Sequence, residues 1–272
     1  MDLGLRGKRA LVTGSSSGIG MAMAMALARE GAAVVVHGRD EARANAVARG
    51  ISEYGRAAVA LGDLASDAGA ESVAAAAHTA FGGIDILVNN AGSYGWWTWE
   101  NTTPQSWTDL LNENLISMVR MVRLLAPAMK SRGWGRLLQI SSTAAPLGLP
   151  FAPEYGAGKA AVIHISSSLA KEYGPFGVTS NALVVGTVAT GSIVDMVREH
   201  VVASGRSPDD PRHVYDAIME SPQAETVKAP IGRLGTPEEI GDIVTMLCSP
   251  RCDFINGATI RADGGRVPSL GI

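Results

Sequence analysis

The sequence contains few residues able to form covalent cross-links. Only two of the 272 residues are cysteine, Cys248 and Cys252, and both fall within the segment CSPRC. Two cysteines exclude a disulfide framework, and the histidines show no spacing typical of a metal site. We therefore expect buried or bystander thiols and no bound metal.

An excess of charge of one sign is also missing. The formal net charge is -3 and the sequence pI is about 6.0, whereas nucleic acids and anionic membranes bind concentrated Lys and Arg. No apolar run approaches the roughly 20 residues that span a bilayer, and the N-terminal apolar stretch is too short for a signal peptide. These absences predict a soluble, cytoplasmic protein without a nucleic-acid or membrane partner.

Short apolar segments, in contrast, are abundant. Hydrophobic residues make up 46% of the chain, and runs rich in Val, Ile and Leu predict seven strands, over residues 9–14, 32–38, 57–63, 84–92, 135–142, 177–186 and 257–265. The runs are apolar at both parities and are separated by helix-length segments, which favours buried parallel strands with crossover helices. We predict a single α/β domain over residues 1–272, with a doubly wound parallel sheet flanked by helices.

Residues 191–230 lack a strand-like run and contain the breaker-rich segment SGRSPDDP, which predicts a lid. Within it, Ser192 and Asp195 have the spacing of a capping box at the start of a helix. The apolar face of that helix comprises Ile193, Met196, Val197, His200 and Val201. Such a face would exclude water from a cleft, although a helix docked on the core would show the same periodicity.

The segment LVTGSSSGIG at residues 11–20 joins the first strand to a helix-prone stretch. Gly14 permits a tight turn, Gly18 lets a ligand approach the backbone, and Gly20 lets the helix pack closely on the strand. Free N–H groups at the start of this helix favour a pyrophosphate. The segment therefore predicts a dinucleotide site, and a merely glycine-rich turn is the alternative.

The segment YGAGK at residues 155–159 carries a potential acid–base pair. In a helix, Tyr155 and Lys159 lie one turn apart, and an ammonium lowers the pKa of a nearby phenol from about 10. Tyr155 is then a general acid for carbonyl reduction and a general base for alcohol oxidation. The absence of a side chain at Gly156 and Gly158 indicates either that a neighbouring backbone passes close by or that a substrate needs the space.

Five segments in one order, namely TGSSSGIG (13–20), NNAG (89–92), Ser142, YGAGK (155–159) and GRLGTPEEIGDIVTMLCSPRCDFINGATIRADGG (232–265), together resemble the short-chain dehydrogenase/reductase family. The likeness covers nearly the whole chain. It implies a Rossmann-type fold that binds NAD or NADP and moves a hydride between the nicotinamide and an alcohol or carbonyl carbon.

The resemblance also implies a catalytic group around the tyrosine–lysine pair. Ser142 would orient the substrate oxygen, and Asn114 would support the lysine through water and complete a proton relay. Ser141 and Asn112 are the rival positions for these two roles.

The turn after the second strand, VVVHGRDE, bears on the choice of cofactor. An acidic residue there accepts hydrogen bonds from the ribose 2′-hydroxyl, whereas an arginine pairs with a 2′-phosphate. The expected acidic position is Gly38, followed by Arg39, so we predict NADP rather than NAD. Asp40 pointing inward would weaken this prediction, as does Ser17, where many NADP-preferring relatives have a basic residue.

By resemblance, the cofactor contacts extend over several strand ends. The predicted cofactor-binding residues are Gly14, Ser16, Ser17, Gly18, Ile19, Gly20, Arg39, Asp63, Leu64, Asn90, Ala91, Gly92, Tyr155, Lys159, Gly186, Val188 and Thr190. Asn90 could equally hold the sheet together.

Aromatic residues make up only 5% of the chain, yet four of the five tryptophans fall between residues 96 and 107. We predict that Trp96 and Trp97, with Ser142 and Met196, contact a hydrophobic or aromatic substrate. Tryptophans packed under a loop or at a subunit contact are the alternative.

The sequence thus predicts an NADP-dependent oxidoreductase acting on a carbonyl or secondary alcohol. The alternatives are a catalytically idle NADP-binding sensor or scaffold and, among enzymes, a 3-oxoacyl-ACP reductase. The resemblance further implies a homotetramer assembled through helices around residues 104–131 and 155–173.

Overall fold

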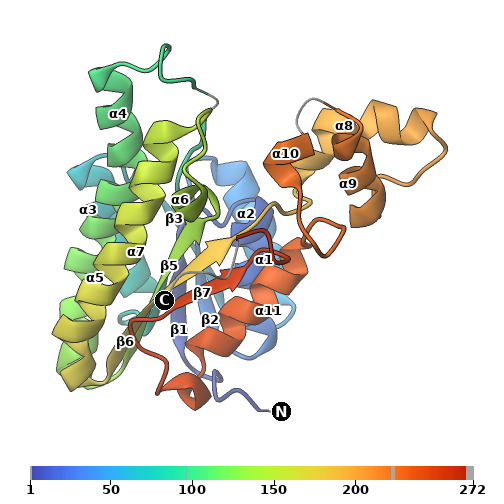
Figure 1. Ribbon diagram of the computed structural model, residues 1–272. Helices are drawn as coiled ribbons and strands as arrows, with labels where there is room; N and C mark the ends of the chain where they lie inside the picture. The colour runs from blue at the N-terminus through green and yellow to red at the C-terminus, as the bar shows by residue number, and fades with distance from the viewer. Residues whose placement is uncertain (1, 96, 222–223, 268–272) are drawn as a thin grey trace.

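The computed structural model describes residues 2–95, 97–221 and 224–267. Its centre is a seven-stranded parallel sheet with the strand order β3-β2-β1-β4-β5-β6-β7 (Figure 1). The strands are β1 (Arg9–Val12), β2 (Ala33–Gly38), β3 (Ala57–Leu61), β4 (Ile86–Asn89), β5 (Gly135–Ser142), β6 (Val178–Val185) and β7 (Thr259–Ala262). The predicted doubly wound fold is confirmed, and each strand falls within its predicted run.

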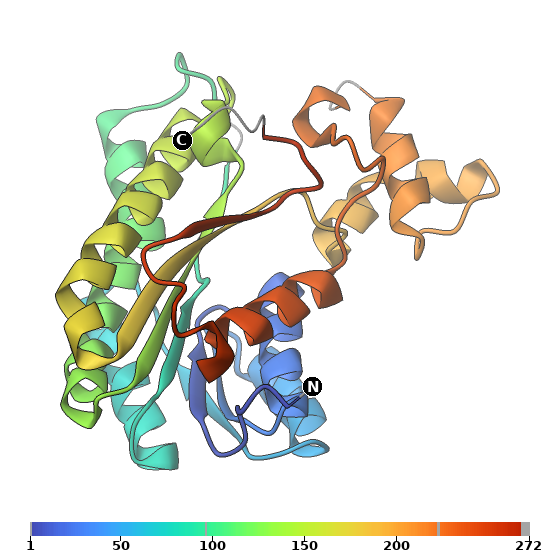
Figure 2. The same cartoon turned by 60° about the horizontal axis from the view of Figure 1, so that its bottom comes forward.

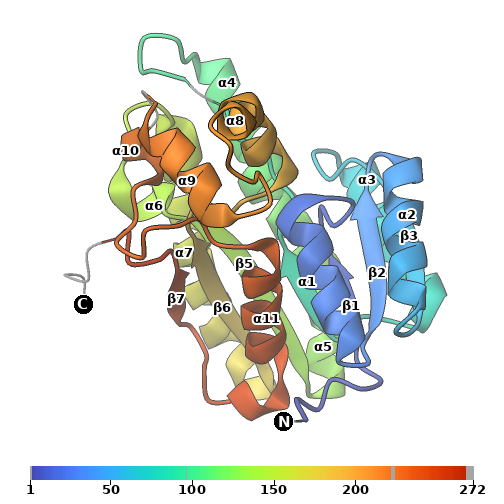
Figure 3. The ribbon, with the colours of Figure 1, turned by 90° about the vertical axis from the view of Figure 1, so that its right-hand side faces the viewer.

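Helices cover both faces of the sheet, as Figures 1 and 3 show. One face carries α1 (Gly18–Arg29), α2 (Glu41–Ser52) and α11 (Pro237–Cys248), and the other carries α3 (Asp67–Phe81), α5 (Ser117–Arg132) and α7 (Pro153–Tyr173). Neighbouring residues of one strand enter different cores, since Val34 and Val36 pack on the first face and Val35 on the second. Both parities of these strands are apolar because both faces are buried.

Short elements complete the carboxyl edge and the connections. They are α4 (Pro104–Leu111), the π-helix η1 (Asn112–Ile116), α6 (Ala144–Leu147) and the 3-10 turns η2 (Gly174–Phe176) and η3 (Pro250–Cys252). The capping box of α4, formed by Thr103 and Ser106, fixes where that helix begins.

Three further helices project beyond the carboxyl edge of the sheet (Figures 1 and 2). They are α8 (Gly191–Ala203), α9 (Pro211–Met219) and α10 (Ala224–Val227). They have a small hydrophobic cluster of their own, which includes Val194, Val214, Tyr215 and Ile218. The described parts of this segment, residues 191–221 and 224–230, therefore form a helical layer at the end of the sheet where ligands of such folds bind.

The predicted capping box of α8 is wrong. The helix is capped by Thr190 and begins at Gly191, so Ser192 lies within its first turn, and its hydroxyl oxygen is 3.2 Å from Thr190 Oγ1. The apolar face is confirmed in part: Val201 is buried, and Ile193 and Val197 pack partly buried against the cluster that contains Val194. His200, which was placed on that face, is exposed. Met196 is 54% exposed.

Two features expected from the composition have their counterparts in the structure. Both cysteine thiols are free, and burial raises the pKa of Cys248 to about 12, so this thiol is unreactive near neutral pH. In the described part of the chain, no helix has the length and apolar character needed to cross a membrane.

Candidate active site

The glycine-rich turn brings the start of α1 against the sheet. Gly14 and Gly18 have φ values of 65° and 56°, which favour glycine. A Cβ at Gly20 would lie 2.2 Å from the carbonyl oxygen of Gly14, so this position excludes any larger residue. The N-cap residue Ser17 makes no side-chain cap hydrogen bond, and the first turn carries no acidic residue. The first N–H groups of α1 are thus left for an anionic ligand.

Two side chains hold this turn in place. Asn90 donates from Nδ2 to the carbonyl oxygens of Thr13 (2.9 Å) and Gly14 (3.2 Å), so it ties β4 to the turn. His37 accepts from the Gly14 N–H at 2.9 Å, and its other ring nitrogen lies 3.1 Å from the Gly62 carbonyl oxygen. Burial lowers the pKa of His37, which favours the neutral ring that these contacts require. The sequence did not single out His37 for this role.

Two cavities adjoin at the carboxyl edge of the sheet. The larger, of about 430 Å³, lies between the start of α1, the start of α7 and α8. The second, of about 250 Å³, lies over the ends of β2 and β3, and both are lined by Ser17, Asn90 and Gly92. Every predicted cofactor-binding residue lines one or both. The two cavities thus share part of their lining at the edge of the sheet.

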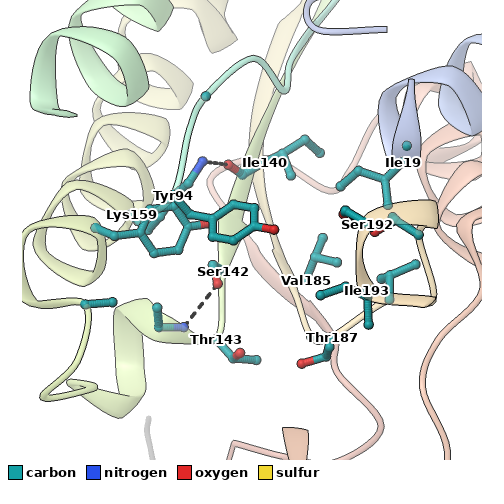
Figure 4. Close-up of a pocket in the computed structure, with 18 of the residues that line it drawn as sticks. Ile19, Tyr94, Ile140, Ser142, Thr143, Lys159, Val185, Thr187, Ser192 and Ile193 are labelled. Atoms are coloured by element: carbon teal, nitrogen blue, oxygen red, sulfur yellow. Dashed lines mark hydrogen bonds between the residues drawn. The ribbon is translucent and has the colours of Figure 1, made fainter. Parts of the chain in front are cut away.

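Ser142 and Ser141 have opposite orientations at the end of β5. Ser141 donates from its hydroxyl to the carbonyl oxygen of Lys159 at 2.8 Å and is buried. Ser142 lies at the cavity, where its oxygen accepts from the Ala144 N–H at 3.2 Å (Figure 4). Its side chain is also close enough to Tyr155 to oppose the rise in the pKa of that phenol. Successive side chains of a strand point to opposite faces of the sheet, so the two serine side chains diverge. Of the two, Ser142 is the one beside Tyr155.

The tyrosine–lysine pair lies at the start of α7. Lys159 is 5% exposed, donates from Nζ to the Ile140 carbonyl oxygen at 3.0 Å, and lies with Nζ 5.6 Å from the centre of the Tyr155 ring (Figure 4). Burial lowers the pKa of Lys159 to about 8. Burial also raises the pKa of Tyr155, and the nearby Ser142 side chain opposes this rise. The expected lowering of the Tyr155 pKa is therefore not present in this structure, because desolvation of the phenolate dominates.

The two glycines of the YGAGK segment face neighbouring elements. A Cβ at Gly156 would lie 2.9 Å from the carbonyl oxygen of Ala144, and one at Gly158 would lie 3.3 Å from a Leu111 methyl group. At Gly156 the structure therefore shows a neighbouring backbone, that of Ala144, passing close by. Helix α7 can pack directly on α6 for this reason.

Asn114 lies in the π-helix η1, which interrupts the helical run from α4 to α5. It is 3% exposed, its Nδ2 donates to the Leu110 carbonyl oxygen at 3.1 Å, and its Oδ1 has no hydrogen-bond partner. Asn112 instead donates to the Ala65 carbonyl oxygen at 2.8 Å and accepts from Arg120, so it joins packed elements. A π-bulge typically marks a functional position, and here it leaves a buried acceptor free for a water molecule.

Arg39 is exposed and lines the smaller cavity with Ser16, Ser17 and Asp63. Asp40 does not point inward, because it caps α2 by accepting from the Arg43 N–H at 3.0 Å. A Cβ at Gly38 would lie 2.7 Å from Ser16 Oγ, which disfavours an acidic residue there.

Only some of the predicted substrate residues line the large cavity. Met196 and Ser142 line the large cavity. Trp97 does not line this cavity. Its backbone N–H donates to the Phe151 carbonyl oxygen at 2.9 Å, and its indole ring lies so close to Gly95 that a Cβ at Gly95 would collide with it. Its expected substrate contact has no support from the cavity lining and stays a prediction. Trp96 lies outside the described residues.

Several lining residues had no clear signal in the sequence. Besides the predicted residues, the large cavity is lined by side chains that include Tyr94, Thr143, Leu149, Phe151, Thr187, Ile193, Ile218, Val227 and Arg266. Thr143 directly follows Ser142, and Arg266 directly follows the DGG segment, so both could have been considered from the sequence. Tyr94, Leu149, Phe151 and Thr187 come from loops whose path the sequence does not specify. Ile193, Ile218 and Val227 come from α8, α9 and α10, and of these only Ile193 belongs to the apolar face predicted for the lid helix.

A sequence profile described as short chain dehydrogenase matches residues 8–226. The chain belongs to the short-chain dehydrogenase/reductase family. Across 270 residues it is 36% identical to the uncharacterized oxidoreductase YvaG of Bacillus subtilis. The match covers 99% of this chain and 100% of that relative.

Solved structures support the same assignment to short-chain dehydrogenases/reductases. L-sorbose reductase from Gluconobacter frateurii, complexed with NADPH and L-sorbose, matches with a TM-score of 0.88 and 32% identity over 99% of this chain and 100% of that one. A 7α-hydroxysteroid dehydrogenase complexed with NADH and 7-oxo glycochenodeoxycholic acid matches with a TM-score of 0.84 and 28% identity over 99% and 98%.

The geometry fits the nicotinamide dinucleotide that such short-chain dehydrogenases/reductases bind. The uncapped start of α1 suits a pyrophosphate, the smaller cavity suits an adenosine, and the larger cavity places Tyr155 beside the space for a nicotinamide and a substrate. The buried Oδ1 of Asn114 has no hydrogen-bond partner and would be available to a water molecule.

The two serines provide a matched test of this site. Ser142→Ala is expected to lower kcat/KM by about 10²-fold, because it removes the hydroxyl beside Tyr155 that would hold the substrate oxygen. Ser141→Ala removes a buried hydrogen bond to Lys159 and is expected to lower the free energy of unfolding by about 1 kcal/mol, with kcat/KM largely retained. Steady-state kinetics and chemical denaturation of both variants check this, and equal kinetic losses would contradict the separation.

Proposed function

We propose that the protein is an NADP-dependent oxidoreductase that moves a hydride between the nicotinamide and the carbonyl or secondary-alcohol carbon of a hydrophobic substrate. The observation that carries this proposal is the meeting of Ser142 and Tyr155 in one cavity, with Lys159 behind them and the start of α1 opposite. A sensor or scaffold has no need of this combination.

The bound cofactor would supply the hydride, and the protein would control the substrate oxygen and its proton. Ser142 would hold the oxygen, and Tyr155 would transfer the proton to it or from it. The raised pKa of Tyr155 keeps the phenol protonated at neutral pH, which is the form that carbonyl reduction requires. Lys159 and the water at Asn114 would then return the proton to Tyr155.

The preference for NADP rests on the smaller cavity. Arg39 lines this cavity and would meet the group on the ribose 2′-oxygen, Asp40 is engaged in capping α2, and Gly38 offers no carboxylate. A guanidinium pairs well with a phosphate. These contacts support NADP over NAD.

Arg39→Ala is expected to raise the KM for NADPH by about 10- to 100-fold, because a charge-assisted phosphate contact is lost, and to change the KM for NADH little. Arg43→Ala is the matched control, since Arg43 is an exposed arginine four residues away that pairs with Asp40 at 3.5 Å. Initial rates with both cofactors decide the question. A similar loss with NADPH and NADH would remove Arg39 from the 2′-phosphate site.

The apolar lining of the large cavity supports a hydrophobic substrate. Met196 and Ile193 come from α8, and Ile218 and Val227 from the helices that follow it. We infer that residues 191–230 act as a lid that excludes water from the reacting atoms.

NADPH consumption across a panel of aromatic and aliphatic ketones, with NADH in parallel and NADPH binding measured separately, tests the proposal. Turnover with a preference for NADPH supports it, and the best ketone defines the substrate class. Including a 3-oxoacyl-ACP in the panel tests the acyl-carrier alternative. Tight NADPH binding with no turnover of any of these would favour the sensor.

We also propose the homotetramer implied by the resemblance, with α5 and α7 among the helices at the interfaces. Light scattering of the purified protein tests it, and a mass corresponding only to a monomer would contradict it.

A further inference from the structure

Arg266 is a cation in the large cavity that the proposed reaction does not use. It follows the turn after β7 and lines both the large cavity and a neighbouring one of about 260 Å³. Its Nη1 donates to the hydroxyl oxygen of Thr187 at 3.3 Å. The Arg266 side chain therefore reaches from the C-terminal segment to the loop that follows β6.

This guanidinium is only partly exposed, and no carboxylate in the described part of the chain lies within ion-pair distance of it. Asp263 is close enough for its charge to act on Arg266, but its two oxygens accept from the N–H groups of Gly265 (3.0 Å) and Val267 (2.9 Å). Arg233, which lines the neighbouring cavity, is paired with Glu239 at 2.6 Å. Burial lowers the pKa of Arg266, which reflects the cost of this unpaired charge.

Two threonines line the large cavity together with Arg266, and one of them, Thr187, accepts its hydrogen bond. Figure 4 shows Thr143 and Thr187 on opposite walls below Ser142. A cation with hydroxyl donors is suited to a carboxylate, because a guanidinium presents parallel N–H groups to its two oxygens. The other cation in the lining, Lys159, is buried behind the catalytic tyrosine. A single available positive charge favours a monoanion over a phosphate dianion.

We propose that Arg266 binds a carboxylate group of the substrate, so that the preferred substrates are apolar oxo acids and the corresponding hydroxy acids. This inference rests on the proposed function for the reaction itself, but the binding step does not require turnover. The apolar walls would hold the hydrocarbon part, Ser142 and Tyr155 the reacting oxygen, and Arg266 the distant acid group.

The test compares each acid with its neutral amide. Binding of 4-oxopentanoate against 4-oxopentanamide, and of 4-acetylbenzoate against 4-acetylbenzamide, is measured by titration calorimetry in the presence of NADP+, where reduction cannot occur. We expect at least one acid to bind about 10- to 100-fold more tightly than its amide, since a charge-assisted contact is gained. Arg266→Gln is expected to abolish this difference while leaving amide binding within about twofold.

Two further variants separate charge from packing. Arg266→Lys is expected to recover part of the preference for the acid, and Arg233→Gln, which removes a paired arginine nearby, is expected to leave it unchanged. Equal binding of acid and amide in both pairs, or a preference that survives in Arg266→Gln, would overturn the proposal. Acid binding through Arg266 without reduction by NADPH would contradict the proposed function and leave the carboxylate site standing.

Discussion

Tyr155→Phe is expected to lower kcat for ketone reduction by about 10²- to 10⁴-fold, because the variant keeps the ring but loses the hydroxyl proposed to give a proton to the substrate oxygen. The ring is largely buried, and phenylalanine fills the same space, so the fold and the KM for NADPH are expected to change little. Steady-state kinetics with the best ketone of the panel, together with NADPH titration, measure both quantities.

Tyr94→Phe is the matched control for this change. Tyr94 lines the same cavity but is 57% exposed, and its hydroxyl is near enough to influence the pKa of Tyr155. We expect its kcat to fall by less than about tenfold. Comparable losses in both variants would show that the proton transfer is not specific to Tyr155.

Lys159→Met is expected to act in opposite directions on activity and stability. It should lower kcat by about 10²-fold or more, because the cation next to Tyr155 is lost. It should also raise the free energy of unfolding at pH 7 by about 1–3 kcal/mol, because the ammonium is 5% exposed and has its pKa lowered to about 8. Loss of the hydrogen bond to the Ile140 carbonyl oxygen offsets part of this gain.

The pH dependence of the stability gain follows from the direction of the pKa shift. The folded-state pKa of about 8 lies below the unfolded value of 10.5, so the unfolded chain binds more protons between these values. The wild type is therefore penalised fully below pH 8, and the penalty disappears as the pH rises to 10.5. The stability advantage of Lys159→Met should fade over the same window.

Denaturation of the cofactor-free protein across this pH range measures the effect. Lys171→Met, at an exposed position on the same helix, is expected to leave the pH profile of the wild type unchanged. A stability difference between Lys159→Met and the wild type that is independent of pH would contradict the account of a desolvated ammonium.

The sheet and the dinucleotide turn could be predicted from the sequence because their constraints are local. Strands covered on both faces need apolar residues at both parities, as Val34 and Val35 illustrate. Gly20 is similarly constrained, since any Cβ there would meet the Gly14 carbonyl group. Such positions restrict the residue type directly, and the sequence therefore records them.

Features that depend on contacts between distant segments were predicted less well. Trp97 folds back over Gly95 because its backbone is held by Phe151, a residue more than fifty positions away. Arg266 reaches the cavity only through the path of the C-terminal segment. The start of α8 was misplaced by two residues, because both Thr190 and Ser192 have side chains suited to capping.

The direction of the Tyr155 pKa shift was predicted wrongly for a related reason. Spacing alone places the lysine and tyrosine on one face of α7, which suggests a direct charge effect. In the structure, Lys159 Nζ turns to the Ile140 carbonyl oxygen, and burial of the phenol has the larger effect on its pKa. The depth of burial is a tertiary property that residue spacing does not contain.

Transfer of the hydride itself provides the most direct test of the proposed function. The protein is incubated with NADPH that carries deuterium at the nicotinamide C4 and with the best ketone of the panel, and the product is examined by mass spectrometry. The account predicts an alcohol with deuterium on the former carbonyl carbon, formed in proportion to the NADPH consumed and strongly reduced in Tyr155→Phe. An alcohol without deuterium from either face of the labelled cofactor, or equal labelling rates in wild type and Tyr155→Phe, would contradict it.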